Sequence, residues 1–174
     1  TGINLEKMKE LVPKNELDQA IKGLSQIINR KCENIGGGIV FVCVLKGGFM
    51  FFSDLVKKIK YPILIDFIQC ESYDGQTQKE LKITKNIELD IKDYTVFIVD
   101  DILDSGNTMT WLKERFLFLG AKQVETVSAV YKENVDFPNH LYIYQQRENV
   151  NPWYVGYGMD DKGYNRNLNT IYTV

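Results

Sequence analysis

A group of acids directly before a loop of small polar residues is the part of this sequence best suited to chemistry. VFIVDDILDSGNTM, residues 96–109, begins with four apolar residues, continues with Asp100 and Asp101, and reaches Asp104 three residues later. Residues 105–108, Ser-Gly-Asn-Thr, add a flexible glycine, two hydroxyls and the first free N–H groups of a predicted helix. Helix N-termini and successive backbone N–H groups bind anions such as phosphate. This segment therefore predicts a phosphate site beside carboxylates.

The carboxylates restrict what the phosphate can belong to. Acids beside an anion site repel the anion unless they hold a cation or bind sugar hydroxyls. Asp100 and Asp101 are adjacent at the end of a predicted strand, so they point to opposite faces and are expected to have different roles. A phosphorylated sugar bound with Mg²⁺ satisfies these conditions. The residues alone leave a simpler alternative open, in which Asp101 or Asp104 only caps the helix. A Walker A loop is excluded, because the sequence contains no GxxxxGK[ST].

The elements that must position this segment alternate between strands and helices. Apolar runs rich in β-prone residues predict strands at residues 39–45, 63–70, 95–99 and 124–131, with a short one at 141–144. Helices are predicted between them, after Gly48 and after the 105–108 loop, the latter ending at Gly120. This alternation predicts an α/β fold with a parallel sheet covered by helices on both faces. Ligands bind beyond the carboxyl ends of such strands, which again selects residues 100–108.

Two further segments have a predicted local structure. Asn15 could cap a first helix. The apolar residues of that helix recur at helical spacing: Leu17, Ala20, Ile21, Leu24, Ile27 and Ile28. Residues 72–80 are polar, contain Asp74-Gly75, and are predicted to form a mobile loop.

Bulk composition excludes several classes of protein. The chain has 174 residues, 44% hydrophobic and 25% charged, which predicts one ordinary globular domain. A net charge of −2 gives no sign of a basic nucleic-acid footprint, although it leaves a local basic patch open, and no apolar run approaches the roughly 18 residues of a membrane span. No signal-like segment opens the sequence. Cys32, Cys43 and Cys70 lack CxxC spacing and are predicted to be buried free thiols, as is typical of the reducing cytoplasm.

Four separated stretches together resemble one known family. They are LKGG at 45–48, SYDG at 72–75, the 96–109 segment, and WYVGYGMD at 153–160. The 96–109 segment resembles the phosphoribosyl-pyrophosphate signature of the type I phosphoribosyltransferases. The four stretches in order resemble the hypoxanthine(-guanine) phosphoribosyltransferases, from about residue 35 to the C-terminus. The resemblance implies a mostly parallel central sheet flanked by helices, with a small hood built from the N- and C-terminal parts. It implies a single domain over residues 1–174, with a core at about 35–150.

The resemblance implies roles for the acidic segment. Asp100 and Asp101 would lie along the ribose hydroxyls, and Asp104 would take or share a proton at N7 of a purine. The 5′-phosphate would be held by the loop residues Ser105, Gly106, Asn107 and Thr108. Some relatives carry a larger or basic residue where Asn107 stands.

Pyrophosphate would be bound by residues from two distant segments, according to the same resemblance. These are Leu45, Lys46 and Gly47, with a non-proline cis peptide between Leu45 and Lys46, and Arg166. Ser72 and Tyr73 would belong to a lid that closes over the reacting centre. From the residues alone, Gly47-Gly48 could be only a tight strand-to-helix turn, and the lid segment could be an ordinary solvated loop.

The purine site implied by the resemblance lies near the C-terminus. Trp153 would stack on the base, Tyr154 and Asp160 would help read its edge, and Asp160 would also bind Mg²⁺ through water. Asp100 and Asp101 are further candidates for the metal. Lys132 would donate to O6, which favours 6-oxopurines over adenine, because the 6-amino group of adenine is itself a donor. Without the resemblance, Trp153 could be a core residue and Lys132 an exposed one. His140 is predicted to be a turn residue without a chemical role.

The activity implied is the reaction of hypoxanthine with phosphoribosyl pyrophosphate to give IMP and pyrophosphate, with guanine as a second substrate. Alternatives are a phosphoribosyltransferase for xanthine or a pyrimidine, or a catalytically weak regulator of the same fold that binds RNA. Neither a nucleic-acid nor a membrane partner is expected. The chain is expected to form a homodimer or a homotetramer.

Overall fold

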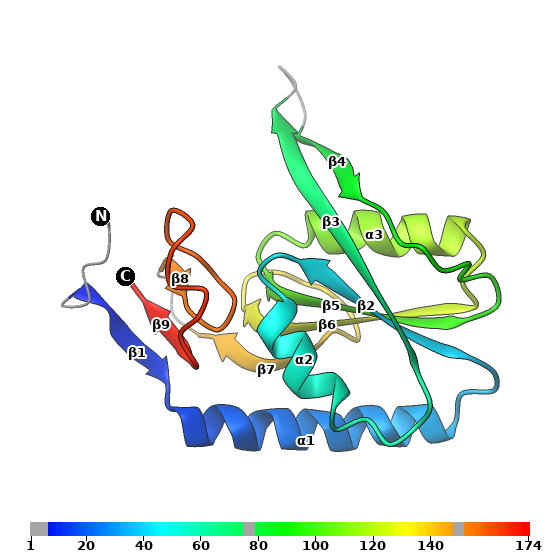
Figure 1. Cartoon of the computed structure of the whole chain (residues 1–174), viewed down its shortest axis with the longest axis horizontal. Helices are drawn as coiled ribbons and strands as arrows, with labels where there is room; N and C mark the ends of the chain where they lie inside the picture. Colours follow the sequence, from blue (N-terminus) through cyan, green and yellow to red (C-terminus); the bar gives the residue numbers. More distant parts are fainter. Residues whose placement is uncertain (1–6, 75–78, 148–151) are drawn as a thin grey trace.

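Two sheets of unequal size organise the chain. The computed structural model describes residues 7–74, 79–147 and 152–174. A six-stranded sheet has the order β4-β3-β2-β5-β6-β7, and a three-stranded sheet has the order β1-β9-β8 (Figure 1). The helices and strands are β1 (Lys9–Val12), α1 (Lys14–Glu33), β2 (Ile39–Leu45), α2 (Phe49–Val56), β3 (Leu64–Asp74), β4 (Lys79–Lys85), β5 (Thr95–Leu103), α3 (Asn107–Phe118), β6 (Gln123–Lys132), β7 (Leu141–Gln146), β8 (Tyr154–Val155) and β9 (Ile171–Thr173).

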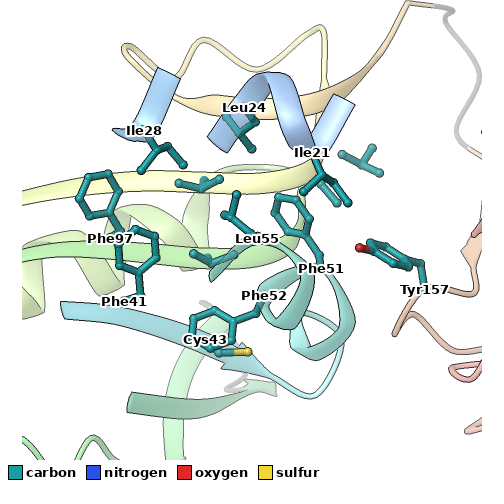
Figure 2. Packing of buried hydrophobic residues seen from close by; sticks show 14 of the residues in the cluster. Ile21, Leu24, Ile28, Phe41, Cys43, Phe51, Phe52, Leu55, Phe97 and Tyr157 are labelled. Carbon is teal, nitrogen blue, oxygen red and sulfur yellow. The ribbon is translucent and has the colours of Figure 1, made fainter. Parts of the chain in front are cut away.

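The large sheet is parallel from β3 through β7, and only β4 is antiparallel to its neighbour. β2 and residues 96–99 of β5 are buried on both faces, which explains their unbroken apolar sequences. On one face α1 and α2 cover Phe41 and Phe97, whose rings stack at 4.6 Å between centroids (Figure 2). On the other face α3 covers alternate residues of the same strands, including Val42 and Ile98. The predicted α/β architecture with helices on both faces is confirmed.

The small sheet forms the predicted hood from the two ends of the chain. β9 pairs antiparallel with β1 on one side and with β8 on the other. Tyr154 and Val155 of β8 and Ile171 of β9 are buried. This sheet therefore ties the segment that holds the WYVGYGMD motif to residues near the start of the chain.

Several local predictions were wrong. α1 begins at Lys14, directly after Pro13, so Asn15 lies inside the first turn and makes no capping hydrogen bond. Ile27 is 46% exposed, because it lies outside the buried face of α1, and Ser25 and Cys32 belong to that face instead. The predicted thiols are all free, but Cys70 is only partly buried.

The described residues of the predicted loop at 72–80 lie in two paired strands and not in a loop. β3 continues to Asp74 and pairs antiparallel with β4, with Ser72 opposite Leu81 and Tyr73 opposite Glu80. Residues 75–78 lie outside the described residues, so the prediction that this segment is mobile stays a prediction. β5 also runs further than expected, through Asp100 and Asp101 to Leu103. Of the helices within the described ranges, none combines the length and apolar character needed to cross a membrane.

His140 is a buried structural residue and not a simple turn residue. Its Nδ1 lies 2.9 Å from Thr126 Oγ1 and its Nε2 lies 2.7 Å from Ser128 Oγ. The Ser128 hydroxyl donates to the Val130 carbonyl, so it accepts from Nε2–H, and Nδ1 accepts from Thr126. Burial lowers the pKa of His140 to about 4.

This shift predicts a loss of stability in acid. Between its ordinary pKa of 6.5 and about 4, the unfolded chain binds a proton at His140 that the folded chain does not. The free energy of unfolding should therefore fall as the pH drops through this interval, by up to about 3 kcal/mol. Denaturant unfolding between pH 7 and pH 4 would measure this decrease in the free energy of unfolding. In a His140→Gln variant the decrease over the same interval should be smaller by that amount. Parallel slopes for the two proteins would contradict the assignment.

Candidate active site

The predicted site residues gather where the parallel strands end. β2 ends at Leu45 and β6 ends at Lys132. β5 carries Asp100 and Asp101 close to its C-terminal end. Because β2, β5 and β6 are neighbours and parallel, these ends share one edge of the sheet. The hood turn that follows β8 lies against the same edge, since Gly158 contacts Gly47.

The two adjacent acids are fixed by the backbone. Asp100 Oδ1 accepts from the Asp101 amide at 2.7 Å, and Asp101 Oδ1 accepts from the Ile102 amide at 2.7 Å. Burial, followed by repulsion from Asp101, raises the pKa of Asp100 well above its usual range. Such a pair is stabilised by hydroxyl donors or by a cation. The site is thus suited to a sugar diol or to a metal-bound substrate.

A phosphate-sized cavity lies beside these acids. It has a volume of about 210 Å³ and is lined by Asp100, Asp101, Ile102, Leu103, Asp104, Ser105, Gly106, Thr108 and Met109. Gly106 has φ 84° and precedes the first residue of α3, so the chain turns sharply and presents the helix N-terminus to the cavity. The Asn107 amide donates to Ser105 Oγ at 3.2 Å. Asn107 itself is exposed and does not line this cavity.

The LKGG segment packs tightly against the acids. The peptide between Leu45 and Lys46 is cis, as the resemblance implied. A Cβ on Gly47 would lie 2.1 Å from Asp101 Oδ2, so only glycine fits beside this carboxylate. A Cβ on Gly158 would lie 2.3 Å from the Gly47 carbonyl oxygen. The loop is therefore enclosed between Asp101 and the hood.

A second cavity adjoins the first. Its volume is about 290 Å³, and it is lined by Asp101, Ile102, Asp104, Lys132, Pro152, Trp153, Tyr154, Met159 and Asp160. It shares Asp101, Ile102 and Asp104 with the phosphate-sized cavity. Lys132 Nζ lies 2.6 Å from Asp104 Oδ1, which places an ammonium and a carboxylate side by side at the boundary. The two cavities together suit a ligand with a phosphate at one end and a planar ring at the other.

Arg166 holds the hood turn. Its Nη1 donates to the Gly158 carbonyl at 2.8 Å, and its Nη2 lies 3.4 Å from Asp160 Oδ1. It lines neither of the two cavities, so its contact with pyrophosphate stays a prediction. The lid role of Ser72 and Tyr73 near the end of β3 also stays a prediction, because Ser72 lines neither cavity and the Tyr73 side chain lies outside the described structure.

Sequence reasoning missed several residues around the second cavity. Pro152 and Met159 line it. Pro152 directly precedes the WYVGYGMD motif and Met159 belongs to it, so their place in the sequence could have identified them as pocket residues. Tyr157 was also missed; its hydroxyl donates to Asp54 and joins the hood to α2. Figure 2 shows the Tyr157 side chain directed toward α2. Nothing in the spacing of residues 54 and 157 indicates that contact.

The acids present fit a magnesium ion that is bound together with a substrate. The described ranges contain no group of three or more His, Cys, Asp or Glu residues able to hold a metal without other ligands. Magnesium in phosphate-handling sites commonly uses one or two carboxylates and takes its other ligands from substrate phosphates and water. Asp100, Asp101 and Asp160 border the cavities and could supply such carboxylates.

An acid-bearing strand end, an anion-binding helix N-terminus and a hood define the type I phosphoribosyltransferase fold, and comparison with known proteins agrees. The family described as phosphoribosyl transferase domain matches residues 8–162, and the chain belongs to this family.

Its relatives include purine enzymes. A hypoxanthine-guanine phosphoribosyltransferase of Aquifex aeolicus is 32% identical over 97% of this chain and 96% of its own length. A hypoxanthine phosphoribosyltransferase of Salmonella typhimurium is 30% identical over 86% and 85%. A crystal structure of a hypoxanthine-guanine phosphoribosyltransferase from Bacillus anthracis is 33% identical, covers 95% of this chain and 98% of its own, and superposes with a TM-score of 0.85.

Proposed function

We propose that this protein transfers the 5-phosphoribosyl group from phosphoribosyl pyrophosphate to hypoxanthine, and also to guanine, giving IMP or GMP and pyrophosphate. The observation that carries this proposal is the pair of adjoining cavities. One has the acids and helix N-terminus that suit a ribose phosphate, and the other has an exposed indole and a lysine that suit a 6-oxopurine. The relatives named above support the choice of base.

The ribose, its 5′-phosphate and its pyrophosphate would be held by separate parts of the sheet edge. Asp100 and Asp101 bind the ribose hydroxyls, and residues 105–108 bind the 5′-phosphate through backbone amides and hydroxyls. Leu45, Lys46, Gly47 and Arg166 bind the pyrophosphate. Ser72 and Tyr73 close over the reacting centre and exclude water, which would otherwise capture the oxocarbenium-like ribosyl group.

The base would lie on Trp153 with its N7 and O6 directed at Asp104 and Lys132. The Lys132 ammonium donates to O6, and the Asp104 carboxylate takes or shares the proton at N7 as the bond to ribose forms. The ion pair between these side chains already places both groups at the boundary between the cavities. Asp160, through water, and Asp100 or Asp101 would hold a Mg²⁺ ion, whose contribution when bound would be to neutralise charge on the pyrophosphate.

A Lys132→Ala variant tests recognition of O6. Loss of a charge-assisted hydrogen bond should lower the preference for hypoxanthine over adenine, expressed as the ratio of kcat/KM values, by about 10- to 100-fold. Steady-state kinetics with both bases would measure it. An unchanged ratio would place O6 recognition at another residue.

The proposed reaction is tested by pyrophosphate release with hypoxanthine, guanine, xanthine and uracil, each with phosphoribosyl pyrophosphate and Mg²⁺. Turnover with hypoxanthine and guanine supports the proposal. Turnover with xanthine or uracil alone would assign a different base, and turnover with none, together with tight RNA binding, would favour a regulator.

We further propose a single domain over residues 1–174 that acts in the cytoplasm as a homodimer or homotetramer, without nucleic-acid or membrane partners.

A further inference from the structure

The indole of Trp153 is tied to the wall of the proposed base pocket. Trp153 is 59% exposed, yet its Nε1–H donates to the backbone carbonyl oxygen of Asp160 at 3.0 Å. Both residues line the same cavity. An aromatic ring that only stacks on a base needs no N–H donor, so this hydrogen bond is a property of tryptophan that phenylalanine could not provide.

The carbonyl that accepts this bond is itself held in place. Asp160 Oδ2 accepts from the Gly163 amide at 2.7 Å, and Asp160 Oδ1 lies 3.4 Å from Arg166 Nη2. The turn is fixed again where Arg166 donates to the Gly158 carbonyl. Because the side chain and the turn are restrained on several sides, the Asp160 carbonyl keeps this orientation, and any second donor must use the remaining lone pair of an oxygen that already accepts from the indole.

The proposed base orientation brings position 2 of the purine toward this carbonyl. N7 and O6 face Asp104 and Lys132, at the ends of β5 and β6. C2 lies on the opposite side of the six-membered ring, so it faces the hood segment that contributes Met159 and Asp160. Guanine has a 2-amino donor at C2, which needs a carbonyl acceptor when it is buried, whereas hypoxanthine has only C–H.

We propose that the Trp153 indole N–H determines base preference, by occupying the Asp160 carbonyl and so favouring hypoxanthine over guanine. This inference rests on the proposed function and deepens it. The 2-amino group of guanine must share or displace an existing hydrogen bond, while hypoxanthine leaves that bond intact. Stacking on the ring is the same for both bases and does not contribute to the difference.

A Trp153→Phe substitution separates the N–H from the ring. Phenylalanine keeps an aromatic face for stacking and releases the Asp160 carbonyl. The kcat/KM ratio of guanine to hypoxanthine should rise about three- to tenfold, the value of one hydrogen bond. The xanthine-to-hypoxanthine ratio should not rise, because xanthine carries an acceptor at position 2.

Trp111→Phe is the matched control, since Trp111 lies on α3 beside Arg115 and lines neither of the two cavities. Its base ratios should equal those of the parent protein. A guanine ratio that is unchanged in Trp153→Phe would overturn the inference alone. Equal rises for guanine and xanthine would also overturn it, because they would indicate added space and not a released carbonyl. Absence of turnover with every 6-oxopurine would overturn the proposed function, and this inference with it.

Discussion

Replacing Asp104 with Asn should lower kcat about 10²–10⁴-fold, the usual contribution of a positioned acid–base group. Asparagine keeps an oxygen that can accept from Lys132, whose Nζ lies 2.6 Å from the Asp104 carboxylate. The shape of the boundary between the two cavities is therefore retained, while the group able to take the N7 proton is lost. Single-turnover kinetics with hypoxanthine would measure the chemical step directly.

The matched control is Asp18→Asn. Asp18 is also an exposed acid paired with a lysine, Lys14, but on the outer surface of α1. Removing such a surface pair changes stability by less than about 1 kcal/mol and should leave kcat unaltered. Near-native turnover of the Asp104→Asn variant would exclude Asp104 as the proton acceptor.

A Gly47→Ala substitution should reduce kcat/KM for phosphoribosyl pyrophosphate by about 100-fold or more. The new Cβ would lie 2.1 Å from Oδ2 and 2.7 Å from Cγ of Asp101. The Asp101 carboxylate could make room only by rotating, and it would then lose the hydrogen bond that its Oδ1 accepts from the Ile102 amide. Displacing by about 1 Å a group that positions a substrate commonly costs about 10²-fold in rate.

Gly36→Ala is the control for this variant, because nothing lies within 4 Å of a Cβ at Gly36. It should retain full activity. Circular dichroism and thermal unfolding of Gly47→Ala would show whether the protein still folds. A folded variant with the kinetic constants of the parent would show that Asp101 moves without consequence, and would remove it from the ribose site.

The elements that the sequence predicted well are those whose signal is local. β2 and residues 96–99 of β5 are continuous apolar runs because both of their faces are covered, so every residue there must be apolar. β4 was missed because KELKITK is a polar edge strand that is specified by its pairing with β3. β1, β8 and β9 are two to four residues long, too short for periodicity to identify them.

The sequence by itself determined the α/β class, the family and the acidic phosphate loop, since residues 96–109 and the helix that follows are contiguous and carry their own geometry. Only the tertiary structure decided which distant groups meet: Lys132 with Asp104, Gly158 with Gly47, and His140 with Thr126 and Ser128. The hydrogen bond from Trp153 to Asp160 belongs with them, because it depends on how the hood turn folds back on itself. Contacts of this kind are set by the packing of whole elements, and sequence spacing carries no record of the distance between side chains after folding.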